Sequence, residues 1–355
     1  MTDETVVTPE EIQACAQTVG GYITGHFVSL MINLGDRLGL YKALAHSGSH
    51  TAASLAQQTG LSERWLLEWL SSQTAAGLIE HEHGAFTLAK AAVPILVDET
   101  SPLNLNGIFT YFVPEDDMAR VAKAFETGIG VSYDQHGPNC ACSVKRLTGP
   151  GHSQLVEHLQ LIDGLHEKLE QGAAVVDVGC GAGVALRELA RHYPNSTFEG
   201  YDPAEAAIEL ARSDAAQDGL TNITFHAAPG EDLPQQPRYD LVLTLDCLHD
   251  MPFPQQVMDA IRGCIKSDGV WVIKDIRCSD QFDENLANPS STMLYSISVL
   301  VCMSSALSEA GGAGLGTMGF NPVLGQQMAQ ASGFSSFIQL PIDSDPFNNY
   351  YEVTV

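Results

Sequence analysis

A cluster of three alternating glycines, with Asp177 before it and Asp202 well after it, gives residues 173–202 a clear capacity for ligand binding. An apolar run ends at Val178, glycines follow in alternate positions, and after a helical pattern a short second strand closes on Asp202. Glycines let a backbone turn approach a ligand closely, and the N–H groups at the start of a helix face that ligand. An acidic residue about 20 positions on can accept hydrogen bonds from both hydroxyls of a ribose. The segment therefore predicts a nucleoside-binding βαβ unit.

The spacing of the glycines indicates which nucleoside binds. A dinucleotide site requires G-x-G-x-x-G, but the sequence has Val184 where the third glycine of that pattern would fall. The pattern D-x-G-x-G-x-G instead resembles the first motif of the class I S-adenosylmethionine (SAM)-dependent methyltransferases. This resemblance implies that Asp177, Gly179, Gly181 and Gly183 hold the methionine end of SAM, which leaves as S-adenosylhomocysteine (SAH).

Acidic residues also follow the third and fourth predicted strands. Glu231 and Asp232 lie in a turn after residues 222–226 that resembles the adenine-binding turn of the same family. That resemblance implies that an acidic side chain takes the adenine amino group, and both residues qualify. Asp246 follows the strand predicted over residues 239–245, at the carboxyl edge of the sheet where ligands bind, and is placed near the methionine end of SAM.

The adjacent residues His249 and Asp250 are the candidates for chemistry on the methyl acceptor. The same region resembles the small-molecule O-methyltransferases, in which a His-Asp pair follows this strand and its histidine deprotonates the acceptor hydroxyl. Imidazole titrates near neutral pH and suits that task. The resemblance implies that His249 is the general base. From their places in the chain, Asp275, after the fifth predicted strand, is a candidate for orienting the acceptor or His249, and Glu309, in the glycine-dense stretch, is a candidate for a second carboxylate.

The atom that accepts the methyl group stays open. The residues on either side of His249-Asp250 lack the aromatic-rich flank of the plant enzymes, so the resemblance supports a base without supporting a phenolic acceptor. The alternative is a thiol or a thioether acid, such as the methylthio hydroxy acid used by similar enzymes that make sulfonium osmolytes. A thioether has no proton to lose, and His249 would then bind the substrate.

A Gly/Pro-rich stretch over residues 128–151 predicts an irregular loop between packed segments, and such loops often bind ligands. Tyr133 and His136 are therefore candidate substrate-binding residues. No metal site is predicted here, because Cys140-x-Cys142 with loosely spaced histidines offers too few ligands at a suitable spacing.

The first hundred residues have the pattern of a winged helix-turn-helix, with a helix from Ser62 and a hairpin around His83-Gly84. DNA binding is not expected, because the recognition-helix candidate holds one basic residue, Arg64, and phosphate contacts supply most non-specific affinity. A winged helix ahead of a SAM domain resembles the dimerisation domain of small-molecule O-methyltransferases and related bacterial methyltransferases. The resemblance implies a homodimer, and a SAM-sensing regulator is the alternative outside enzymes.

Composition restricts the partners further. The 355 residues carry a formal net charge of −26, which disfavours nucleic acid and anionic membranes. The first residues are acidic where a secretory signal needs basic ones, no apolar stretch reaches the length of a membrane span, and the eight cysteines show no framework spacing. A cytoplasmic protein acting on a small molecule is expected.

Alternating strands and helices from Gly172 onward predict an α/β fold, a Rossmann-like doubly wound sheet of the class I methyltransferase type. A mainly α winged-helix dimerisation domain precedes it. The predicted domains are residues 1–100 for dimerisation, 101–171 for a helical linker and acceptor-binding layer, and 172–355 for SAM binding. A reversed last strand is implied by the methyltransferase resemblance.

Overall fold

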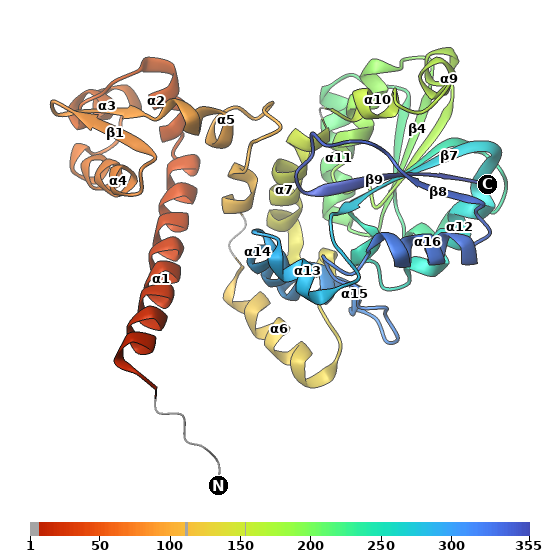
Figure 1. The fold of residues 1–355 in the computed structure, drawn as a ribbon. Helices are drawn as coiled ribbons and strands as arrows, with labels where there is room; N and C mark the ends of the chain where they lie inside the picture. Colours follow the sequence, from red (N-terminus) through yellow and green to blue (C-terminus); the bar gives the residue numbers. More distant parts are fainter. Residues whose placement is uncertain (1–6, 111–112, 153) are drawn as a thin grey trace, which may run out of the picture. The chain divides into compact units, whose positions relative to one another are not determined.

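The computed structural model describes residues 7–110, 113–152 and 154–355 (Figure 1). The chain divides into two compact units, Met1–Thr110 and Tyr111–Val355. The predicted three-part division assigns roles as well as boundaries, and it stays a prediction. None of the helices formed by the described residues combines the length and apolarity that a membrane span requires.

The first unit has the winged helix-turn-helix architecture expected from the sequence. Its elements are α1 (Pro9–Arg37), α2 (Leu40–Ser47), α3 (Ala52–Thr59), α4 (Glu63–Ala75), β1 (Ile79–Glu82), β2 (Ala85–Leu88), η1 (Lys90–Ala92), α5 (Val93–Leu96) and η2 (Asn106–Thr110). As predicted, the Thr51 side chain caps α3 and Gly60, with a φ of 74°, ends it. β1 and β2 pair antiparallel, which confirms the hairpin.

Helix α4 packs into the core of this unit with one side and carries its one basic residue on another. Trp69 is buried, and its indole Nε1 donates to the carbonyl oxygen of Met31 at 2.9 Å. The guanidinium of Arg64, the one basic residue of α4, lies 2.5 Å from the Glu68 carboxylate. The helix therefore has no unpaired cation to offer to a phosphate backbone.

The second unit is built on a seven-stranded sheet, counted over the described residues, with the order β5-β4-β3-β6-β7-β9-β8. Its strands are β3 (Ala174–Val178), β4 (Thr197–Asp202), β5 (Ile223–Ala227), β6 (Tyr239–Leu245), β7 (Ile265–Ile276), β8 (Ser336–Gln339) and β9 (Asn348–Thr354). Strands β3 to β7 are parallel, and β9 runs antiparallel between β7 and β8. The predicted class I methyltransferase sheet with a reversed last strand is confirmed.

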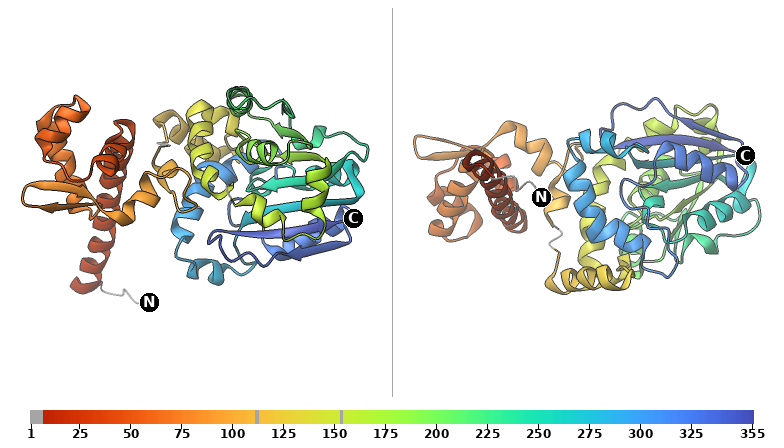
Figure 2. Two further views of the ribbon diagram at one scale, coloured as in Figure 1. Left: turned by 90° about the horizontal axis from the view of Figure 1, so that it is seen from above. Right: turned by 60° about the horizontal axis from the view of Figure 1, so that its bottom comes forward.

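Both faces of this sheet are covered by helices, as the views in Figure 2 show. Val175 of β3 packs in a core with residues of α8 (Leu155–Leu159), α9 (Leu165–Gln171), α10 (Val184–His192) and α11 (Glu205–Gln217). Val176 and Val178 pack on the other face with residues of α12 (Pro254–Cys264) and α16 (Pro322–Ala331). Neighbouring strand residues point to opposite faces, so a strand buried on both sides is apolar throughout.

The prediction of a loop over residues 128–151 is wrong, because most of this stretch is helical. Helix α6 (Glu115–Thr127) is followed by α7 (Tyr133–His152), which has a kink at Gly137. Gly137, with φ 73°, breaks the helix, and Pro138 lies at the start of the segment that follows, where its missing N–H costs no hydrogen bond. Glycine and proline here mark a kink rather than a loop.

The segment after β7 is helical and then glycine-rich. Its elements are α13 (Phe282–Ala287), α14 (Ser291–Ile297), the π-helical turn η5 (Ser298–Cys302) and α15 (Met303–Ala306). Backbone N–H groups in the glycine-rich stretch bind elsewhere: Ala313 donates to the carbonyl of Pro252 at 2.8 Å, and Gly316 donates to that of His249 at 3.1 Å. These bonds attach the stretch to residues around His249.

Candidate active site

The glycine-rich loop after β3 depends on backbone conformations that favour glycine. Gly179, Gly181 and Gly183 all have positive φ angles, of 77°, 51° and 67°. A Cβ atom at Gly183 would lie 2.5 Å from the Phe225 ring, whereas one at Gly181 would meet no atom within 4 Å. Gly183 is therefore needed for packing, while Gly181 leaves the loop open to a ligand.

Two carboxylates flank this loop, at the ends of β3 and β4. The Gly181 N–H donates to Asp202 Oδ2 at 2.9 Å, and the Ala204 N–H donates to Asp202 Oδ1 at 2.9 Å. Asp177 is 2% exposed, and its Oδ1 has no hydrogen-bond partner among the described residues. Burial, and then the charge of Asp202, raises the pKa of Asp177 well above its ordinary value, and burial also raises the pKa of Asp202.

The turn after β5 distinguishes the two candidate adenine ligands by exposure. Glu231 and Asp232 lie in the short helix η3 (Gly230–Asp232), where Glu231 is half-buried and Asp232 is exposed. Burial, and then the charges of Glu309 and Asp232, raises the pKa of Glu231. Glu309 thus lies towards Glu231, whereas Asp275 contacts His249.

Asp246 follows β6 in a left-handed backbone conformation, with a φ of 58°. A non-glycine residue pays about 1–2 kcal/mol for this conformation, and such strain is concentrated at functional sites. Its Oδ2 lies 2.6 Å from the Nζ of Lys274, a lysine that is only 4% exposed. The sequence analysis missed Lys274, although a lysine inside the apolar run of β7 was a signal.

His249 and Asp250 lie in the short helix η4 (Leu248–Asp250), beside β7. The imidazole Nδ1 of His249 is 2.6 Å from Asp275 Oδ1, and its Nε2 is 3.1 Å from Asp250 Oδ1. Burial lowers the pKa of His249, but the two carboxylates outweigh it and raise the pKa well above the ordinary value. The predicted pair is therefore part of a carboxylate–imidazole–carboxylate row.

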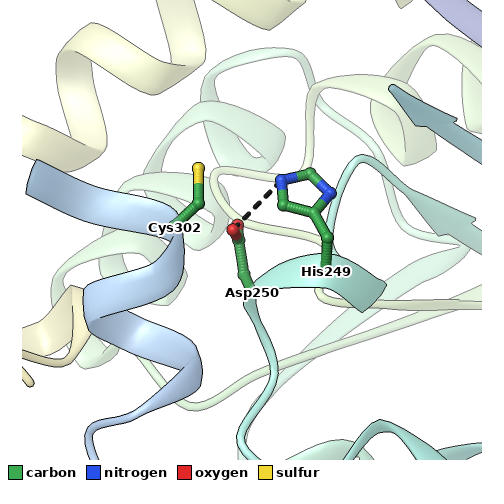
Figure 3. Close-up of side chains that lie close together, drawn as sticks. All are labelled: His249, Asp250 and Cys302. Carbon is green, nitrogen blue, oxygen red and sulfur yellow. Dashed lines mark ion pairs between the residues drawn. The ribbon is translucent and has the colours of Figure 1, made fainter. Parts of the chain in front are cut away.

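Helix α7 and the turn η5 bring two further residues to this row. The Tyr133 hydroxyl donates to Asp250 Oδ2 at 2.8 Å. Cys302 is buried, and its sulfur lies within 4.8 Å of the nearest ligand atoms of His249 and Asp250 (Figure 3). The sequence analysis missed Cys302, and no local pattern around it could have indicated this contact.

The remaining sequence candidates lie apart from His249. His136 is buried in α7, and its Nδ1 is 3.0 Å from Asp117 Oδ2. Cys140 is buried and Cys142 is exposed, and neither belongs to a potential metal-binding group among the described residues. The structure thus brings Tyr133 to the His249–Asp250 pair, and the roles of Tyr133 and His136 in substrate binding stay predictions.

Comparison with known protein families places a separate domain in each unit. Residues 169–313 match the model of a methyltransferase domain, and residues 26–93 match that of the Rv2258c-like winged HTH domain. The ubiquinone biosynthesis O-methyltransferase of Acinetobacter baylyi is 32% identical over 100 residues, which are 28% of this chain. The matched region spans 41% of the length of that enzyme.

Solved structures resemble the fold over nearly the whole chain. Human N-acetylserotonin methyltransferase in complex with SAM superposes with a TM-score of 0.68 and 16% identity, covering 100% of this chain and 99% of the other. The mitomycin 7-O-methyltransferase MmcR has a TM-score of 0.68 and 18% identity, covering 98% and 99%. At such identities the likeness shows the fold. The chain contains a methyltransferase domain over residues 169–313, preceded by a winged helix-turn-helix domain over residues 26–93.

Proposed function

We propose that this protein is a SAM-dependent methyltransferase that transfers a methyl group to a small-molecule acceptor and releases SAH. The observation that carries this proposal is the loop of three positive-φ glycines beside Asp202, in a segment that matches a methyltransferase domain. The open side of Gly181 and the backbone N–H groups of the loop suit close approach of a cofactor.

The charges around the loop suit the cofactor chemically. In this proposal Asp202, at the tip of β4, takes both ribose hydroxyls, and Glu231 or Asp232 takes the adenine amino group. SAM carries a positive sulfonium, which would relieve the unfavourable burial of Asp177 and Asp202. Asp246, at the end of β6, is assigned to the methionine end.

For an acceptor hydroxyl, His249 is the proposed general base. Asp275 fixes its Nδ1, so that Nε2 is the atom that would accept the proton, on the side where Asp250 lies. The methyl carbon then bonds to the acceptor oxygen as its bond to the SAM sulfur breaks. Alignment and deprotonation are the tasks this transfer requires.

Product analysis tests the proposal directly. The protein is incubated with methyl-deuterated SAM and a panel of phenols, amines, thiols and thioether acids, and products are examined by mass spectrometry. We expect a labelled product whose fragments place the methyl on one atom. SAM binding without label in any product of the panel would count against an enzyme and favour a SAM-binding regulator.

The role of His249 is tested by substitution. His249→Gln should slow methylation of a hydroxyl by about 100-fold or more, the usual contribution of a general base, with SAM affinity unchanged. The matched control is His192→Gln, at an exposed position in α10. Retention of most activity in His249→Gln would remove the base from the proposal and leave methyl transfer intact.

A sulfur acceptor is the second candidate, and one observation favours it. Both ring nitrogens of His249 face carboxylates, so the imidazole has no free nitrogen in this structure. A thioether has no proton to lose and needs no base. If His249→Gln methylates thioether acids at the wild-type rate while losing activity on hydroxyls, sulfur is the natural target.

We propose that the first unit pairs two chains. Trp65 on α4 is 79% exposed, beside an apolar groove of about 670 Å³ whose lining includes Met31 and Leu34 of α1. Exposed apolar patches of this kind mark interaction sites. Size-exclusion chromatography with light scattering should give a dimer, and Trp65→Glu should shift it towards monomer, whereas Glu63→Gln on the same helix should not.

A further inference from the structure

Three buried side chains from two separate segments meet where the acceptor is proposed to bind. His249 and Asp250 belong to η4, and Cys302 ends the π-helical turn η5. One ligand atom from each, a ring nitrogen, a carboxylate oxygen and the thiol sulfur, lie within 4.8 Å of one another. Figure 3 shows Asp250 between the other two. The three residues are 3%, 8% and 7% exposed, so water screens them little.

The hydrogen-bonding pattern leaves a position for a cation between them. With its proton on Nδ1, directed at Asp275, His249 presents the lone pair of Nε2 to Asp250 Oδ1 at 3.1 Å. Oδ1 has no hydrogen-bond partner among the described residues. Two acceptors at that distance repel unless a proton or a metal ion lies between them. A buried carboxylate in this position is costly without a positive partner, which either a protonated imidazole or a bound metal ion supplies.

Outer contacts orient these side chains in the way metal ligands are usually oriented. Metal-binding histidines commonly donate their second ring N–H to a carboxylate, and ligating carboxylates are themselves hydrogen-bonded. Asp275 holds His249 Nδ1 at 2.6 Å, and the Tyr133 hydroxyl holds the second oxygen of Asp250 at 2.8 Å. The π-helical turn that positions Cys302 is a distortion frequently found at functional sites.

We propose that His249, Asp250 and Cys302 bind one zinc ion and leave its fourth position to the sulfur of a thiol acceptor. Nitrogen, oxygen and sulfur ligands together suit zinc, and three protein ligands with one open position are typical of catalytic zinc sites. Thiolate is a soft ligand that a zinc ion with a cysteine ligand accepts readily. No local spacing in the sequence indicates this site, because Cys302 lies more than 50 positions after the adjacent His249 and Asp250.

This inference rests on the proposed methyl transfer and names its substrate class. On binding zinc the acceptor thiol loses its proton to solvent, since a coordinating thiol is deprotonated outright. The thiolate sulfur then bonds to the methyl carbon as the carbon–sulfur bond of SAM breaks, and SAH leaves. With zinc bound, His249 acts as a ligand, and deprotonation of the acceptor no longer needs its Nε2.

Cobalt substitution tests the site without relying on activity. The full chain, freed of metal with a chelator, is titrated with Co²⁺ and Zn²⁺ and followed by absorption spectroscopy and elemental analysis. We expect one ion per chain and a thiolate-to-cobalt charge-transfer band. Cys302→Ser should abolish the band and weaken Zn²⁺ binding by more than about 100-fold, since loss of a mere outer contact costs about 10–100-fold.

The controls separate a missing ligand from a missing fold. Cys264→Ser alters a cysteine that is fully buried in the core at the end of α12, and it should keep the band. Asp250→Asn keeps the side-chain shape, removes a ligand oxygen and should weaken Zn²⁺ binding. Circular dichroism and SAM affinity verify that each variant is folded. Absence of a thiolate band in the wild type, or an equal band in Cys302→Ser, overturns the proposal.

The outcome also separates this inference from the proposed function. Full methyl transfer by metal-free protein would remove the zinc proposal and keep the methyltransferase. A cobalt band that depends on Cys302, in a protein that labels no acceptor from SAM, would keep the metal site and remove the methyltransferase. Two results together support both the metal site and the methyltransferase. Cys302→Ser loses methyl transfer to thiols, and the metal-free wild type regains it when Zn²⁺ is added.

Discussion

Two pairs of carboxylates at the carboxyl edge of the sheet differ in what lies between them. Asp177 and Asp202 face the glycine loop, and Asp202 accepts hydrogen bonds from the backbone N–H groups of Gly181 and Ala204. Asp250 and Asp275 hold the imidazole of His249 between them, at 3.1 Å and 2.6 Å. Burial disfavours the charged form of the first pair until a ligand brings a positive charge, whereas the second pair is already matched by the protein's own ring.

This difference teaches that the two ends of the site do separate work. A carboxylate pair without a cation suits a ligand that brings hydroxyl donors and a positive sulfonium, the chemistry of SAM. A pair that encloses an imidazole, or an ion ligated by it, suits activation of a second reactant. Changes at the first pair should therefore alter cofactor affinity, and changes at the second should alter turnover.

The largest effect is expected at the cofactor end. Asp202→Ala should raise the Kd for SAM by about 100-fold or more, because hydrogen bonds to a charged group are worth about 1.5–3 kcal/mol each and the ribose would lose two. Isothermal titration calorimetry measures this change. Glu209→Gln, a nearby charge change on α11, is the control. A change in Kd below about threefold for Asp202→Ala would contradict the assignment of the ribose to this residue.

The next effect concerns the loop that holds this end together. Gly183→Ala should lower the free energy of unfolding by about 3 kcal/mol, because a left-handed conformation costs about 1–2 kcal/mol and overpacking against Phe225 costs about 1–3 kcal/mol more. Urea denaturation measures the change. Gly219→Ala, at φ 69° with no atom within 4 Å of the new Cβ, should lose only the first contribution. Equal losses in the two variants would show that packing against Phe225 is unimportant.

The third effect should appear at the other pair. Asp275→Asn removes the carboxylate that orients His249 Nδ1, and it should lower kcat by about 10–100-fold, the usual cost of losing such an outer contact. The Kd for SAM should stay the same. Asp283→Asn, in α13, is the matched control. Loss of SAM affinity equal to the loss in kcat would show that the two ends of the site are not separable.

The same two regions show what a sequence can reveal. Asp177, the glycines and Asp202 lie in one βαβ unit, so their spacing alone predicts that they meet. Tyr133 and Cys302 reach the His249–Asp250 pair through the packing of α7 and η5, which no local pattern encodes. Asp275 is a candidate from its place after the fifth predicted strand, and its contact with His249 follows from the neighbouring positions of β6 and β7.

Local composition also misled the assignment of structure. Glycine and proline over residues 128–151 predict a loop, but Gly137 and Pro138 occur where a helix is interrupted and restarts. Whether this segment forms a helix or a loop depends on which of its side chains are buried, such as Cys140 and His152. That burial is determined by the assembled fold and not by the local sequence.

A further pair of titratable side chains, Lys274 and His152, makes the stability of this region depend on pH. Lys274 lies 2.6 Å from Asp246, and burial, followed by the charge of Lys274, lowers the pKa of His152 to about 3. Above pH 6.5 this histidine is neutral in both the folded and unfolded chains. Below pH 6.5 the unfolded chain takes up a proton that the folded chain refuses, so stability falls as the pH falls.

This smallest effect is isolated by comparing two proteins at two pH values. Between pH 7 and pH 5 the wild type should lose about 1–2 kcal/mol more unfolding free energy than His152→Gln, which has no titrating ring, at about 1.4 kcal/mol per pH unit. The many acidic groups titrate in both proteins, so their contribution cancels in the difference. Urea denaturation at each pH provides the values. Equal losses would mean that His152 takes up its proton in the folded chain as well. Burial and the charge of Lys274 would then not prevent protonation of His152.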